Sequence, residues 1–112
     1  MEKKMIAGVG IDIVEVERLS EKPKLWERFI SAKEFKYLEK FKFKEEHVAG
    51  IWAAKEALVK ATNNREIIFC DVSVAHDGSG RPYFEDFETE GTLHLSISHE
   101  KHYATAVVVW EK

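Results

Sequence analysis

Two acidic residues and a lysine have the types and spacing from which a metal site could be built. Asp12 follows the short apolar run MIAGVGI, so its carboxylate has few solvating neighbours and needs a cation, a helix N-terminus to cap or the edge of a sheet. Glu56 and Lys60 stand four residues apart in a helix-forming stretch. Mg²⁺ takes oxygen ligands, commonly one or two carboxylates completed by phosphates and waters. Asp12 and Glu56 could supply those two carboxylates.

The same residues also have ordinary structural explanations. A Glu-to-Lys pair at i,i+4 usually stabilises a helix surface by a few tenths of a kcal/mol. Lys55 lies on an otherwise apolar or mildly polar helix face, which comprises positions 48, 51, 52, 55, 58, 59 and 62. A lysine in such a place commonly lays its stem along apolar surface and keeps its ammonium in water. Local sequence leaves the structural and the chemical interpretation open.

Ser98 and His99 form a second candidate pair, near the turn of the last predicted hairpin. Neighbouring residues of a strand point to opposite faces, so the two cannot easily act together as nucleophile and base. The chain has no G-x-S-x-G motif, which disfavours serine-based hydrolysis. His99 is either a histidine that contacts a phosphate or a partner, or a plain turn residue.

Hydrophobic patterns and caps predict the elements that position these residues. Residues 5–12 read as a first, buried strand. Ser31 and Glu34 have the spacing of a capping box, so a helix should begin near Ala32 and run to about Phe43. A longer helix is predicted from Glu45 to Thr62, ended by the pair Asn63-Asn64.

Four further strands are expected in the second half of the chain. The segment 67–75 places Ile68, Cys70, Val72 and Val74 on one side with period two. After the turn sequence DGSG, a brief strand is predicted at 83–85, followed by TLHLSIS and HYATAVVVW around the tight segment SHEK. This order predicts an α+β fold with a mainly antiparallel sheet packed against the long helix.

Length and composition are those of a small globular protein. The chain has 112 residues, 45% of them apolar and 33% charged, which predicts a single domain over residues 1–112. A domain this small has difficulty enclosing a deep site, so a site between subunits of an oligomer is expected. We find no signal peptide and no apolar run long enough to cross a bilayer, which predicts a cytoplasmic location.

The cysteine content and the charge distribution argue against a zinc site and against nucleic-acid binding. Cys70 is the only cysteine and is predicted to be buried and inert, and the five histidines have no zinc-site spacing. Residues 18–44 carry nine Lys or Arg against four Glu, a net +5 within a chain of net charge −3. Such a segment either attracts a phosphate-rich ligand or an acidic protein, or is only a solvated surface. Nucleic-acid binding is not expected, because the pI is about 6.0 and no recognised module is present.

Three segments together resemble the holo-acyl-carrier-protein synthases, the small trimeric type of 4'-phosphopantetheinyl transferase. They are GVGIDIVEVERL (8–19), WAAKEALVKA (52–61) and LSISHEKHYATAVVV (95–109). The segment DVSVAHDGSGRPYF (71–84) resembles the family's strand and glycine-proline turn. The resemblance implies the 4'-phosphopantetheinyl transferase fold and transfer of the phosphopantetheine arm of coenzyme A to a serine of apo-acyl carrier protein.

The resemblance also implies roles for individual residues. Asp12 and Glu56 match the family's Mg²⁺ ligands, and Lys60 matches a lysine that stabilises charge on the leaving group. Lys55, Lys60, Ser98 and His99 match positions that bind coenzyme A. Glu56, or a metal-ordered water beside it, is the candidate base. Arg18, Lys22, Lys24 and Arg28 are candidate contacts to the acidic carrier protein, and the family implies a homotrimer with interfacial active sites.

Two positions qualify this match. Larger relatives carry a second acid two residues after the first, where this chain has Val14, so a water would take that place. Many relatives have arginine where this chain has Ile51, which puts one charged contact to coenzyme A in doubt. That loss motivates an alternative, a non-catalytic module that binds coenzyme A or a carrier protein. A metal-dependent phosphohydrolase, using the same acids, is a second alternative.

Overall fold

The computed structural model describes residues 3–20 and 22–112 of the chain. In chain order the elements are β1 (Ile6–Glu15), α1 (Glu17–Ser20), α2 (Pro23–Trp26), α3 (Ala32–Leu38), α4 (Glu45–Thr62), the 3₁₀ helix η1 (Phe69–Asp71), β2 (Ser73–His76), β3 (Pro82–Glu85), β4 (Thr92–His99) and β5 (Tyr103–Glu111). No helix among these residues is long and apolar enough to cross a membrane.

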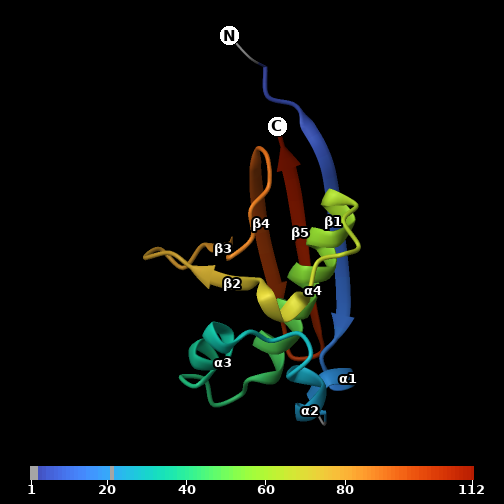
Figure 1. The fold of residues 1–112 in the computed structure, drawn as a ribbon. Coiled ribbons are helices and arrows are strands. Elements are labelled where there is room, and N and C mark those ends of the chain that lie inside the picture. Colours follow the sequence, from blue (N-terminus) through green and yellow to red (C-terminus); the bar gives the residue numbers. More distant parts are fainter. Residues whose placement is uncertain (1–2, 21) are drawn as a thin grey trace.

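The centre of the fold is a three-stranded antiparallel sheet with the long helix α4 lying along one face (Figure 1). The strand order is β1-β5-β4, so β1 is an edge strand although it comes first in the chain. Strands β2 and β3 form a separate two-stranded sheet that projects to one side (Figure 1). The predicted α+β fold, with an antiparallel sheet against the long helix, is confirmed.

Glycine lets α4 lie unusually close to β1. A Cβ added to Gly8 would stand 1.8 Å from the Ala61 carbonyl oxygen, and one added to Gly10 would stand 2.0 Å from the Ala57 carbonyl oxygen. Both obstacles are helix backbone, which cannot rotate away as a side chain can. The small residues of the two elements therefore set the spacing between strand and helix, and with it the position of Asp12 relative to α4.

The first strand differs from its prediction in length and burial. It runs to Glu15, so Asp12 lies inside the strand and does not cap a helix. Its two faces also differ: Val14 is buried against α4, whereas Val9, Ile11 and Ile13 are 56–67% exposed. A single chain supplies cover for only one face of the sheet, and the apolar sequence of β1 did not reveal that the other face is open.

Two other predicted elements are shorter in the structure. The predicted strand 67–75 is replaced by η1 followed by the short β2, so Ile68 is exposed while Val72 and Val74 remain buried. Cys70 lies on η1 and is exposed, so the prediction of a buried thiol was wrong. Helix α3 ends at Leu38, earlier than the predicted Phe43, although its capping box is confirmed.

Candidate functional site

Asp12, Glu56 and Lys60 come together where β1 crosses α4. The Lys60 ammonium lies 3.1 Å from Oδ1 of Asp12 and donates to the Ile11 carbonyl at 2.9 Å. Glu56 is one helical turn before Lys60, so both side chains leave the same side of α4. The three residues predicted from their types and spacing are therefore neighbours, despite more than forty residues of chain between Asp12 and the helix pair.

The electrostatics of this cluster suit a divalent cation. Partial burial raises the pKa of Glu56, the nearby Asp12 raises it further, and Lys60 opposes the shift. The two acids thus repel each other, and a shared cation would relieve that repulsion. The described residues contain no group of three or more His, Cys, Asp or Glu placed for a metal. Two carboxylates with phosphates and waters are a donor set that fits Mg²⁺.

A cavity of about 350 Å³ adjoins the two acids and carries both signs of charge. Its lining residues are Asp12, Ile13, Val14, Arg18, Leu19, Lys22, Leu25, Trp52 and Glu56. The indole of Trp52 forms one wall and is held edge-on by Phe29 and Phe69, with ring centroids 4.8 and 5.6 Å away. The acids can hold a cation, and the exposed bases beside them can hold an anion. The cavity therefore suits a metal-bound diphosphate.

Lys55, predicted to bind coenzyme A, has a different place in this structure. Its side chain is fully buried, and its ammonium donates to the Phe29 carbonyl at 2.6 Å, to Oε1 of Glu34 at 2.6 Å and to the Phe69 carbonyl at 2.8 Å. These bonds use all three hydrogens of the ammonium, leaving none for a ligand. Burial lowers the pKa of Lys55, and Glu34 opposes that shift. This geometry conflicts with both predictions for Lys55, that its ammonium reaches water and that it binds coenzyme A.

Ser98 and His99 lie apart from the acidic cluster. Ser98 is in register with Thr105 of β5, which is in register with Ile13 of β1, so Ser98 lies on the open face of the sheet. His99 lies on the opposite face, beside the first turns of α4, where its Nδ1 is 2.9 Å from Oε1 of Glu46. One chain does not bring these two residues to the acids, because two strand spacings and, for Ser98, the sheet itself intervene.

Ile51 belongs to the core. It is 3% exposed and faces the interior of the fold, whereas its neighbour Trp52 reaches the cavity. Ile51 therefore supplies no positive charge to the cavity. The bases that line the cavity are Arg18 and Lys22, in and just after α1.

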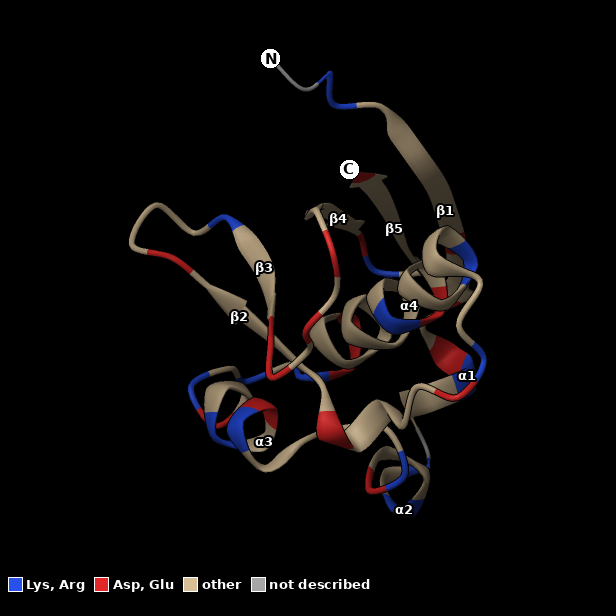
Figure 2. Ribbon diagram, turned by 45° about the horizontal axis from the view of Figure 1, so that its top comes forward, with Lys and Arg blue, Asp and Glu red and all other residues tan. Residues whose placement is uncertain are grey.

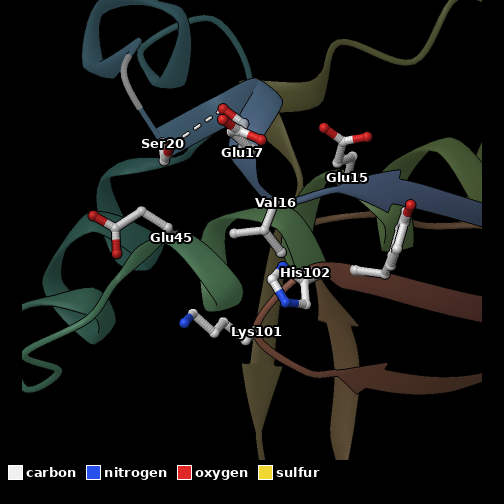
Figure 3. A pocket seen from close by; sticks show the side chains of 8 residues that line it. Glu15, Val16, Glu17, Ser20, Glu45, Lys101 and His102 are labelled. Atoms are coloured by element: carbon white, nitrogen blue, oxygen red, sulfur yellow. Dashed lines mark hydrogen bonds between the residues drawn. The ribbon is translucent and has the colours of Figure 1, made fainter.

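A second, larger cavity of about 600 Å³ lies near the turn between β4 and β5 (Figure 3). Glu15, Glu17 and Glu45 line it together with Lys101 and His102 (Figure 3). The three carboxylates of this cavity outnumber its one lysine and repel a diphosphate, whereas two acids and two bases line the cavity beside Asp12 and Glu56. We therefore place the candidate site at Asp12 and Glu56.

Sequence reasoning missed two acidic partners. Glu34 was recognised only as part of a capping box, yet it also accepts from Lys55 and from the Val74 amide. Glu46, the partner of His99, stands 53 residues away and had no local signal. The one cue for Glu34 was Lys55 on an apolar helix face, because a lysine that is buried there needs an acid as its partner.

Comparisons with known proteins extend over almost the whole chain. Residues 8–108 match the model described as the 4'-phosphopantetheinyl transferase superfamily. A protein of Halothermothrix orenii is 43% identical over 124 residues, covering 96% of this chain and 99% of the relative. One of Anoxybacillus flavithermus is 41% identical over 118 residues, covering 96% and 98%. Both are named holo-[acyl-carrier-protein] synthase.

Solved structures agree with these sequence matches. A holo-(acyl-carrier-protein) synthase of Bacillus anthracis, in complex with CoA (3',5'-ADP), has a TM-score of 0.89 and 40% identity, covering 96% of this chain and 98% of that one. The Helicobacter pylori synthase in complex with coenzyme A has a TM-score of 0.78 and 32% identity, covering 91% and 98%. This chain therefore belongs to the 4'-phosphopantetheinyl transferase superfamily and, within it, to the holo-[acyl-carrier-protein] synthases.

Proposed function

We propose that this protein transfers the 4'-phosphopantetheine group of coenzyme A to a serine of apo-acyl carrier protein, yielding holo-acyl carrier protein and adenosine 3',5'-bisphosphate. The observation that carries the proposal is the meeting of Asp12, Glu56 and Lys60 beside a cavity lined by both acids and bases. The acids can bind a divalent cation, and the bases can bind a diphosphate. The two relatives described above are named for this activity.

Asp12 and Glu56 are the residues that would hold Mg²⁺, which when bound neutralises charge on the diphosphate. The serine hydroxyl of the carrier attacks the β-phosphorus, and the bond from that phosphorus to the bridging oxygen breaks. Lys60 then exchanges its contact with Asp12 for the oxygen that gains charge on the leaving bisphosphate. Glu56, or a water beside it, accepts the serine proton. Ser98 and His99 hold coenzyme A, and Lys55 is omitted because its three hydrogens are already bonded.

Intact-mass spectrometry of an apo-acyl carrier protein tests this function. Incubation with the protein, coenzyme A and Mg²⁺ should add one phosphopantetheinyl group, and the gain should disappear with a chelator or in Asp12→Ala. No gain with several carriers, from folded protein that still binds coenzyme A, would instead support the non-catalytic binding module. Release of phosphate without a carrier would support the phosphohydrolase.

The carrier protein is the proposed acidic partner, and the bases near α1 and α2 are its proposed contacts. Arg18, Lys22, Lys24 and Arg28 are all exposed, and three of them line a shallow cavity with Pro23 and Leu25. Figure 2 shows these basic segments at the α1 and α2 end of the molecule. Raising the salt concentration should weaken carrier binding much more than coenzyme A binding. Equal sensitivity of the two would contradict this docking site.

A homotrimer with active sites between subunits is also part of the proposal. Support comes from the open sheet face, where Val9, Ile11 and Ile13 expose apolar surface that a single chain leaves uncovered. Ser98 lies on that face and Asp12 on the other, so one ligand meets both more readily when they come from different subunits. Analytical ultracentrifugation should give the trimer mass, and Ile11→Glu should shift it toward monomer with loss of transfer. A fully active monomer would refute the proposal.

The proposal also covers the domain organisation and the cellular location of the protein. We propose that residues 1–112 act as one transferase domain and that the reaction takes place in the cytoplasm. An exposed, unpaired Cys70 suits a reducing compartment. Cell fractionation followed by the mass assay tests the location.

A further inference from the structure

His99 is held by groups that the proposed reaction has not yet used. Its Nδ1 lies 2.9 Å from Oε1 of Glu46, in the first turn of α4. The side chains are 30% and 34% exposed, so the contact is partly screened from water and both residues keep some solvent access. This pair lies outside the acidic cluster at Asp12.

The ring of His99 also contacts an aromatic neighbour. His47 meets it edge-on with a centroid distance of 4.8 Å, and His47 itself stacks on Phe41 at 3.7 Å. Gly50 lies beside the ring, where an added Cβ would stand 3.9 Å from Cδ2 of His99, an ordinary contact distance. The Glu46 carboxylate and the His47 ring thus restrict how the imidazole can turn.

His47 acts in this arrangement as an uncharged surface. Burial lowers its pKa, and the neighbouring His99 lowers it further, while Glu46 opposes the shift. A lowered pKa favours the neutral form of the His47 ring. The carboxylate of Glu46 faces His99 as its hydrogen-bond partner.

We propose that Glu46 is a positioning residue that accepts the Nδ1–H of His99 and presents Nε2 to a phosphate of coenzyme A. A histidine nitrogen that faces a phosphate must carry a hydrogen, so the ring binds this ligand with both nitrogens protonated. Glu46 then accepts from Nδ1 and balances the added charge. Among the described residues, Nε2 of His99 has no hydrogen-bond partner, which leaves it available. The inference rests on the proposed function, because coenzyme A is the ligand in both.

Steady-state kinetics of Glu46→Ala test the role, with Glu45→Ala as the matched control. Both glutamates lie in the first turn of α4, so helix-end electrostatics change equally. We expect KM for coenzyme A to rise about tenfold in Glu46→Ala with little change in kcat, the size of one charge-assisted contact. Glu45→Ala should stay within about twofold of wild type. In a His99→Ala background, Glu46→Ala should add nothing further.

Nitrogen NMR of the His99 ring, with circular dichroism as the check of folding, separates this inference from the proposed function. In the wild type, Nδ1 should carry a proton, and its ¹⁵N shift should move in Glu46→Ala but not in Glu45→Ala. A ring unaffected by Glu46→Ala, or an equal KM increase with His99 already removed, would overturn the positioning role even if transfer is normal. Absence of transfer with the expected ring signals would count against the proposed function alone.

Discussion

Two lysines of α4, Lys55 and Lys60, each contact a carboxylate in very different surroundings. The Lys55 and Glu34 side chains are both 0% exposed, and the ammonium also bonds two backbone carbonyls. The Lys60 and Asp12 side chains are 51% and 17% exposed, and Lys60 has one further acceptor. The same helix thus carries one ion pair enclosed by protein and one open to solvent and ligands.

This difference in burial gives the two lysines different roles: Lys55 stabilises the fold, whereas Lys60 can bind a ligand. Around Lys55 every strong donor and acceptor is used, since Glu34 also accepts from the Ser31 and Val74 amides. That network connects α3, α4, η1 and β2, and its desolvation cost is repaid only while all members are present. Lys60 keeps hydrogens and solvent access, so it can exchange Asp12 for another anion without disturbing the fold.

Lys55→Met should have the largest effect on stability. Methionine keeps the unbranched shape of the side chain, one atom shorter, but leaves the Glu34 carboxylate buried without its cation, which should cost about 3–5 kcal/mol of unfolding free energy. Urea unfolding followed by circular dichroism measures this. A loss below about 1 kcal/mol would mean that the buried pair does not organise the fold.

Gly10→Ala tests the spacing on which the exposed pair depends. The new Cβ would clash with the backbone of Ala57, so either β1 or α4 must move, at a cost of about 3 kcal/mol. Gly78→Ala is the control, because a Cβ there would meet nothing within 4 Å. Equal stability of the two variants would show that the close approach of strand and helix is not needed.

Lys60→Met should separate catalysis from stability. The pair with Asp12 is exposed, so unfolding free energy should change by less than about 1 kcal/mol. Transfer should fall about 100-fold, the typical effect of removing one group that stabilises transition-state charge. Mass-spectrometric rates at saturating coenzyme A measure the second quantity. Wild-type rates would remove Lys60 from the mechanism.

Salt should give the smallest effect and the sharpest contrast. Raising NaCl to about 1 M shortens the screening length to about 3 Å, so the stability difference between wild type and Lys60→Met should shrink by a few tenths of a kcal/mol. The difference for Lys55→Met should stay constant because solvent ions do not reach that pair. Parallel unfolding curves at low and high salt provide the comparison, and equal salt dependence would contradict the assigned burial.

Local signals in the sequence predicted several elements closely. Helix α4 has the predicted bounds, and Asn63 ends it in a left-handed conformation with φ of 53°. The capping box at Ser31 and the final hairpin were also predicted. These features depend on residues within a few positions of one another, so period, caps and turn residues carry enough information. The acid, glutamate and lysine of the candidate site were found from residue type, spacing and resemblance.

Contacts between distant segments were decided only by the tertiary structure. The partner of Lys55 is 21 residues away and that of His99 is 53 residues away, and no local pattern states which acid reaches which base. Likewise, the apolar sequence of β1 does not say that Ile11 faces outward, and the period of 67–75 does not reveal that Cys70 is exposed. The sequence by itself determined the elements and the candidate chemistry, because these follow from short-range backbone preferences. The packing of α4 on one face of the sheet decided which lysine is enclosed and which remains free to act.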